Sequence, residues 1–202
     1  LEELVNYFEY DYPEPQSHPF SVSTELSVCP WAEGHQLLRV GLKGKSSPFS
    51  ERKRCNLVFL LDVSGSMMHG KKLPLVKSAL KLWINELADD DRIAIVVYAG
   101  ASGVVLDSTS LSKAPEILDA IENLRAGGST NGGEGIQLAY KIARENFSED
   151  GTNRVLLCTD GDFNVGITDQ SELIRLIQKE AKSNVFLSVF GFGSGNLNDA
   201  TM

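Results

Sequence analysis

The sequence of 202 residues has few cysteines, and their spacing gives no zinc site and no redox Cys-x-x-Cys pair. Cys158 lies in an apolar strand pattern and is expected to be a small buried hydrophobic residue. Cys29 and Cys55 are compatible with a disulfide in an oxidising compartment and equally with two free thiols. The cysteines therefore leave the compartment open.

Positive charge is also scarce, because the formal net charge is −8 and the sequence pI is about 4.9. An acidic surface repels phosphate groups, which disfavours nucleic acids and anionic membranes as partners. The short run Glu51–Arg54 is interpreted as a solvated loop rather than a binding patch. No apolar run is long enough to cross a bilayer, and no signal-peptide pattern opens the chain.

Residues 1–50 differ in pattern from the rest of the chain and are predicted to form an N-terminal extension. A helical stripe of apolar residues predicts a short helix over Leu1–Tyr12, ended by prolines. Alternating apolar and polar residues over Phe20–Val28 and His35–Lys43 predict a β-hairpin. Residues 51–202 are predicted to form the main domain.

Apolar strands alternate with amphipathic helices throughout this main domain. The predicted strands are 57–61, 92–98, 104–106, 154–158 and 185–190, and the predicted helices are 72–88, 113–124, 133–147 and 170–182. Such alternation indicates an α/β fold with a doubly wound, mostly parallel sheet and helices on both of its faces. Ligands of such sheets bind at the carboxyl ends of the strands, near the point where the strand order reverses.

The first core strand is followed at once by Asp62, Ser64 and Ser66, three oxygen-bearing residues at alternate positions. If the loop curls, as Gly65 permits, these side chains converge on one point and provide the oxygen ligands that hard cations prefer. A helix cap is the structural alternative, but a cap accounts for one such residue and not for three.

Two further loops carry oxygen ligands, although each has a plain structural alternative. Asp160, in Thr159–Gly161, follows a buried strand and is also compatible with a simple Asp-Gly turn. Thr130 lies in the glycine-rich run 126–133 before a helix, and it is also compatible with a helix N-cap.

Taken together, these motifs resemble the metal-ion-dependent adhesion site of von Willebrand factor type A domains, over the chain from Cys55 to its end. The matching residues, which the resemblance identifies as metal ligands, are Asp62, Ser64, Ser66, Thr130 and Asp160. Four segments are more narrowly similar to a bacterial subgroup, the YfbK-like proteins: Asn6–Phe8, Cys29–Trp31, Gly127–Gly133 and Thr159–Gly166.

The resemblance implies that the first and fourth core strands are neighbours at the centre of the sheet, with Asp62 and Asp160 at their ends. It implies that Ser64, Ser66 and Thr130 bind the ion directly, and that the two aspartates bind it directly or through water. It also implies a last strand and helix that the chain ends before reaching. Asp162 is expected to shape the turn.

The function that the resemblance implies is metal-dependent binding of another protein, whose acidic side chain completes the coordination of the ion. The small ligand set favours Mg²⁺, with Mn²⁺ and Ca²⁺ as alternatives. The expected compartment is the periplasm or cell surface of a bacterium, and the oligomeric state is not predicted. The expected rim of the site is Met67, Met68, His69, Ala101, Asn131 and Phe163, with core packing as the alternative for one methionine.

An enzyme is the main alternative, in the form of a metal-dependent hydrolase of α/β fold; a scaffold with an unused site is another. A haloacid-dehalogenase-type phosphatase needs a second acid where this chain has Ser64. A serine hydrolase needs glycines where Asp62 and Ser66 flank that serine. An EF-hand needs a turn glycine where Met67 lies and a glutamate where Leu73 lies. We therefore expect a non-enzymatic domain.

Overall fold

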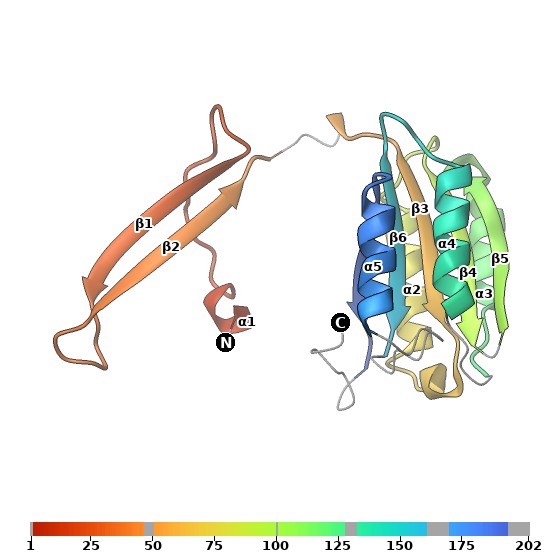
Figure 1. The fold of residues 1–202 in the computed structure, drawn as a ribbon, viewed down its shortest axis with the longest axis horizontal. Coiled ribbons are helices and arrows are strands. Elements are labelled where there is room, and N and C mark those ends of the chain that lie inside the picture. Colours follow the sequence, from red (N-terminus) through yellow and green to blue (C-terminus); the bar gives the residue numbers. More distant parts are fainter. Residues whose placement is uncertain (1, 47–50, 100, 128–132, 161–169, 194–202) are drawn as a thin grey trace. The chain divides into compact units, whose positions relative to one another are not determined.

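The structure is a computed structural model that describes residues 2–46, 51–99, 101–127, 133–160 and 170–193. The chain divides into two compact units, Leu1–Arg52 and Lys53–Met202 (Figure 1). Within the described ranges, no helix combines the length and the apolar composition needed to span a bilayer.

The N-terminal unit is an antiparallel hairpin preceded by a very short helix. The hairpin strands are β1 (Phe20–Val28) and β2 (Gln36–Gly44), and their pairing confirms the predicted hairpin. The helix α1 covers only Glu2–Val5, so the prediction of a helix reaching Tyr12 is wrong.

Contacts with the hairpin hold Tyr10 and Tyr12 in a non-helical segment. The Tyr12 ring lies so close to Gly41 that a Cβ built there would meet it at 2.2 Å, and the Tyr10 ring stacks on Tyr12. The guanidinium of Arg39 lies over both rings, at 5.2 and 5.8 Å from their centroids. Because a short helical pattern is weak alone, these tertiary contacts outweigh it at Tyr10 and Tyr12.

The second unit contains a five-stranded sheet in the order β5-β4-β3-β6-β7, which confirms the predicted doubly wound α/β fold (Figure 1). Its strands are β3 (Cys55–Asp62), β4 (Arg92–Ala99), β5 (Ala101–Ser110), β6 (Thr152–Thr159) and β7 (Val185–Gly191). All neighbouring strands pair in parallel except β5, which is antiparallel to β4. The first and fourth core strands, β3 and β6, are neighbours, as the resemblance implies.

Helices cover both faces of this sheet. They are α2 (Leu73–Ile84), α3 (Ala114–Asn123), α4 (Gly133–Glu145) and α5 (Gln170–Ala181), with 3₁₀ turns η2 (Gly65–Met68) and η3 (Leu111–Lys113). Successive side chains of β3 enter different cores: Phe59 packs with α2 and α3, and Leu60 packs with α4. Because both faces are covered, β3 is apolar throughout its middle, as the sequence predicts.

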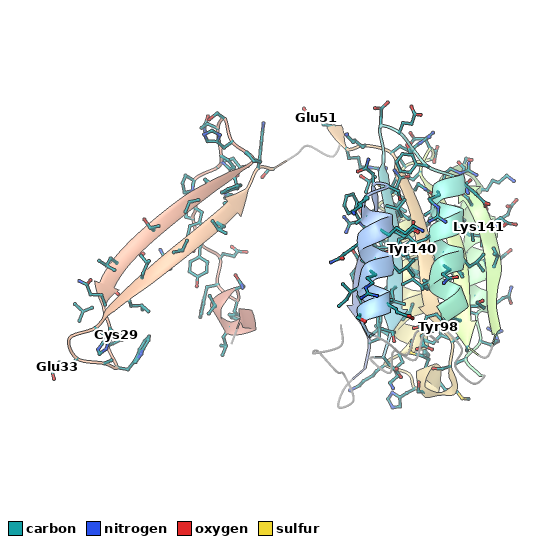
Figure 2. All side chains as sticks on the ribbon, in the orientation of Figure 1. Cys29, Glu33, Glu51, Tyr98, Tyr140 and Lys141 are labelled. Atoms are coloured by element: carbon teal, nitrogen blue, oxygen red, sulfur yellow. The ribbon has the colours of Figure 1, made fainter. Side chains whose placement is uncertain are left out.

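Tyr98 of β4 and Tyr140 of α4 are among the largest fully buried side chains of the core on the α4 side (Figure 2). Helix α4 lies close to the sheet, since a Cβ built on Gly135 would meet Cβ of Tyr98 at 2.9 Å. This packing fixes the position of Tyr98, which also contacts the site described below.

A buried polar network lies at the amino ends of the strands, opposite the carboxyl ends where the site described below lies. The Asn56 side chain donates to the carbonyl of Ala143 at 2.9 Å and to Oδ1 of Asn153 at 3.0 Å. The Asp91 carboxylate accepts from the amides of Cys55 and Ala88. Each of these buried groups has hydrogen-bond partners within the fold, so the network is structural.

The cysteines are free thiols in the structure. Cys158 is buried as predicted, and burial raises the pKa of its thiol to about 12. It is therefore held in the protonated, unreactive form.

The two apolar cores of the second unit are built entirely from residues that follow Arg52. We therefore predict that residues 53–202, expressed alone, fold and unfold cooperatively. Their melting midpoint is expected within about 4 °C of that of the full chain, a difference of about 1 kcal/mol at this size. Circular dichroism melting curves of the two proteins make the comparison, and a fragment without a cooperative transition would contradict the prediction.

Candidate metal centre

Asp62 is the last residue of β3 and lies at the carboxyl edge of the sheet, with 1% of its surface exposed. Its Oδ1 accepts a hydrogen bond of 2.8 Å from the backbone amide of Ser64. Its Oδ2 lies 3.4 Å from both the Tyr98 hydroxyl and the Thr159 hydroxyl. Groups from β4, β6 and the following loop thus fix this carboxylate in place.

The two serines of the motif lie together where the loop begins its 3₁₀ turn. Ser64 is buried at the N-cap position of η2, Ser66 is exposed within it, and their Oγ atoms are 2.9 Å apart. The expected curl therefore exists, but Gly65 does not have the positive φ that would require a glycine. A Cβ at Gly65 would meet nothing within 4 Å, so no close contact requires a glycine at this position either.

Asp160 follows β6 directly and is completely buried. The register that pairs Leu61 with Cys158 brings the ends of β3 and β6 side by side, and the two aspartates with them. The prediction that the fold brings Asp62 and Asp160 to neighbouring strand ends is therefore confirmed.

The electrostatics of the two carboxylates reflect this proximity. Burial raises the pKa of Asp62, and the charge of Asp160 raises it further, while hydrogen bonds from Ser64 oppose both effects. Burial and the charge of Asp62 also raise the pKa of Tyr98, which remains a neutral hydroxyl. Two carboxylates that are buried together are stable as anions only with a cation beside them.

A lysine that the sequence analysis did not single out supplies a positive charge at this point. Nζ of Lys72 lies 2.8 Å from Oδ2 of Asp160, and only 12% of the lysine side chain is exposed. Lys72 lies between η2 and α2, and no sequence motif there indicates a role at the site. The strand order is what brings it to Asp160, 88 residues away in the sequence.

Thr130, the fifth predicted ligand, lies outside the described residues, as do Asn131, Asp162 and Phe163. The described chain before Thr130 does reach the site: the amide of Gly127 donates to the carbonyl of Val63 at 2.8 Å. Gly127 has a φ of 151°, a conformation that favours glycine.

The structure describes the side chains of three predicted rim residues, the two methionines and His69. Met67 is buried in the core and Met68 is 68% exposed, so one methionine packs inside and the other faces solvent. His69 is exposed, and its ring accepts a hydrogen bond from the amide of Lys71. Its own turn therefore holds the ring at the surface.

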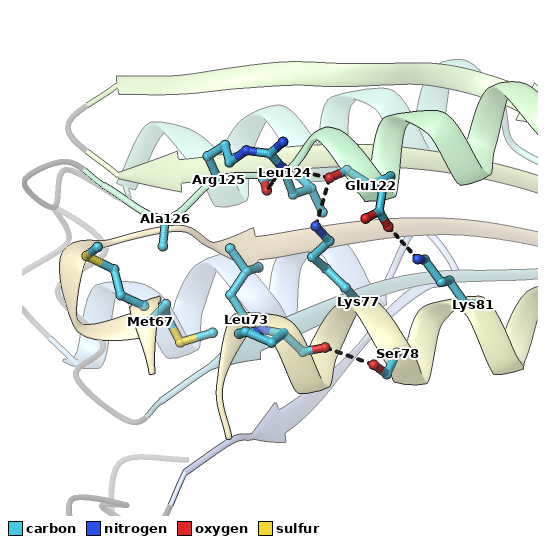
Figure 3. A pocket seen from close by; sticks show the side chains of 11 residues that line it. Met67, Leu73, Lys77, Ser78, Lys81, Glu122, Leu124, Arg125 and Ala126 are labelled. Carbon is cyan, nitrogen blue, oxygen red and sulfur yellow. Dashed lines mark hydrogen bonds and ion pairs between the residues drawn. The ribbon is translucent and has the colours of Figure 1, made fainter. Parts of the chain in front are cut away.

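A groove of about 470 Å³ runs beside the loop, between α2 and α3 (Figure 3). Its cations are already engaged: Lys77 and Arg125 donate to the carbonyl of Glu122 at the end of α3, and Lys81 pairs with the Glu122 carboxylate. Lysine and arginine side chains that donate hydrogen bonds to the last carbonyls of a helix commonly stabilise its C-terminal end. The groove is therefore explained by the packing of α2 against α3.

The donor chemistry of the site fits a hard divalent cation. Among the described residues, no group of three or more His, Cys, Asp and Glu side chains is placed to hold a metal. The converging donors are two carboxylates and two hydroxyls, which are all oxygen and suit Mg²⁺ or Mn²⁺ rather than a soft metal.

Comparison with known proteins identifies relatives of both units. The family model of the von Willebrand factor type A domain matches residues 56–202, and a model described as von Willebrand factor matches residues 1–39. Over its full length the chain is 46% identical to the uncharacterized protein YfbK of Escherichia coli. It spans 36% of the length of that protein.

Solved structures share the fold at low sequence identity. Manganese-loaded TRAP protein from Plasmodium vivax has a TM-score of 0.60 and 21% identity, over 74% of this chain and 61% of that one. Proximal thread matrix protein 1 from the mussel byssus, with a zinc-occupied MIDAS motif, has a TM-score of 0.59 and 20% identity, over 74% and 40% of the two chains. The family model covers most of the sequence and the fold agrees with it: the chain belongs to the von Willebrand factor type A domain family.

Proposed function

We propose that this domain binds one divalent cation through Asp62, Ser64, Ser66, Thr130 and Asp160, and uses the ion to bind a partner protein. The observation that carries the proposal is the meeting of two buried carboxylates with a pair of serine hydroxyls 2.9 Å apart, at the carboxyl edge of the sheet. In doubly wound sheets this edge is where ligands bind.

The charge balance of the site favours an acidic ligand. Two carboxylates neutralise a divalent ion, and the hydroxyls add no charge, so an open coordination position remains electrophilic. An aspartate or glutamate of another protein is the natural group to fill it. Because the chain as a whole carries a net charge of −8, the bound ion would provide a local attraction on an otherwise repulsive surface.

The identity of the ion is part of this proposal, and Mg²⁺ is our first choice. The related folds were solved with manganese in TRAP and with a zinc-occupied MIDAS motif in the mussel protein, which supports a divalent metal in this fold. Few carboxylates and several neutral oxygens suit Mg²⁺, with Mn²⁺ next and Ca²⁺ less favoured.

A non-enzymatic role agrees with the surroundings of Ser64. The Ser64 hydroxyl lies 2.9 Å from that of Ser66 and beside the Asp62 carboxylate, an arrangement that suits neutral and charged oxygen ligands of one cation. Domains of this family are generally interaction modules. Exposed Met68, next to the loop, offers an adaptable apolar contact for the partner. Export to the periplasm or cell surface stays a prediction from the resemblance.

The first test is Mg²⁺ binding by Asp62→Asn, a substitution that retains an oxygen for the amide of Ser64. We expect isothermal titration calorimetry to show at least a 100-fold loss of affinity, since outer partners of ligands alone change affinity by roughly 10–100-fold. Without metal the variant is expected to be as stable as the wild type or more so, because one of two mutually repelling buried charges is gone.

Asp107→Asn is the matched control, because Asp107 is an exposed carboxylate on β5. It should bind Mg²⁺ like the wild type. Equal binding by wild type and Asp62→Asn, or no binding by either, would leave the fold as a scaffold with an unused site.

The second test concerns the partner. We predict that immobilised wild-type domain retains proteins from a bacterial extract in Mg²⁺ and releases them in EDTA, and that Asp62→Asn retains none of them. Mass spectrometry identifies the retained set, and Asp107→Asn again serves as the control. A set of proteins that is unchanged by EDTA and by Asp62→Asn argues against metal-mediated binding.

A further inference from the structure

Lys72 occupies a position where the local rules of helix formation disfavour it. It is the N-cap residue of α2, and a lysine has no acceptor with which to cap the free amides there. Its positive charge also lies at the positive end of the helix dipole. No capping hydrogen bond from its side chain is formed. A residue that violates two local preferences is usually retained for another contact.

That contact is the buried carboxylate of Asp160. Nζ of Lys72 lies 2.8 Å from Oδ2 of Asp160, with side-chain exposures of 12% and 0%. The backbone of Lys72 is held at both ends, because its amide donates to the carbonyl of His69 and its carbonyl accepts from the amide of Val76. The lysine therefore reaches the site from a fixed point on the chain.

A cation at this atom matters because Asp160 and Asp62 repel each other. Both side chains are buried at the neighbouring ends of β3 and β6, so two negative charges meet where water cannot screen them. Lys72 neutralises one of the two charges within the fold. The same Oδ2 atom belongs to a carboxylate proposed above as a metal ligand, so the ammonium and the ion compete for one group.

We propose that Lys72 is the resident counter-ion of the metal centre: it holds Asp160 in the metal-free protein and releases it when the cation binds. The proposal rests on the metal-binding function proposed above. Two consequences follow. Lys72 keeps the metal-free domain stable, and it lowers the affinity for metal, because the ion must displace a positive charge before it can bind.

Substitution by methionine tests both consequences, since Lys72→Met retains the long apolar stem and removes the charge. In EDTA the melting midpoint should fall by about 6 °C or more, because a buried carboxylate loses the ammonium that neutralises it. The dissociation constant for Mg²⁺, measured by calorimetry, should tighten roughly tenfold or more, because a nearby positive charge is removed. The rise in melting midpoint on adding Mg²⁺ should grow accordingly.

Lys71→Met is the matched control, because Lys71 is the adjacent lysine and is exposed. Neither its melting midpoint nor its Mg²⁺ affinity should change. Lys72→Arg keeps a positive charge at the position and should stay closer to the wild type than Lys72→Met in both measurements.

A second measurement needs only the wild-type protein and so does not depend on the folding of a variant. Reductive methylation followed by mass spectrometry should modify Lys72 slowly in EDTA, and at a rate approaching that of Lys71 in saturating Mg²⁺. This increase reports release of the ammonium from Asp160.

The possible results separate this proposal from the function on which it rests. If the wild type binds Mg²⁺ but Lys72→Met binds it no more tightly, or Lys72 is equally protected with and without the ion, the counter-ion role is wrong and the metal site stands. If calorimetry shows no Mg²⁺ binding by the wild type or by Lys72→Met, the proposed function itself fails.

Discussion

The parallel pairing of β3 with β6 is the constraint on which the rest of the site depends. β3 is apolar from Leu57 to Leu61 and β6 from Val155 to Cys158, and an aspartate lies at the carboxyl end of each. The pairing brings Asp62 and Asp160 together in a region that excludes water, where neither charge is stable without compensation. Ser64 and the hydroxyls of Tyr98 and Thr159 contact Asp62, and the ammonium of Lys72 contacts Asp160.

Much of this arrangement could be predicted from the sequence, because it depends on local patterns. The apolar run of β3, the alternation with helices and the motif from Asp62 to Ser66 each have a short-range signature. The short α1 could not be predicted, since the apolar stripe continues to Phe8, and no local pattern shows that Tyr12 packs on Gly41. Sequence patterns report what a segment can form alone, whereas this outcome depends on a partner strand.

Lys72 illustrates the same limit at the site. Nothing distinguishes it from Lys71 in the sequence, and only the distance of 2.8 Å to Asp160 does so in the structure. The expectation for Gly65 also changes: the loop curls without a positive φ, and a Cβ there would meet no neighbour, so the curl does not depend on a glycine. In both cases the residue is understood from what surrounds it in three dimensions.

The central claim is that the two aspartates and the two serines hold a single metal ion. The most direct measurement is a crystal structure of the domain with Mn²⁺, with diffraction data collected at the manganese absorption edge. The account predicts one strong anomalous peak, in contact with the oxygen atoms of Ser64 and Ser66 and adjacent to Asp62 and Asp160. A peak elsewhere on the protein, or none at saturating Mn²⁺, would contradict it.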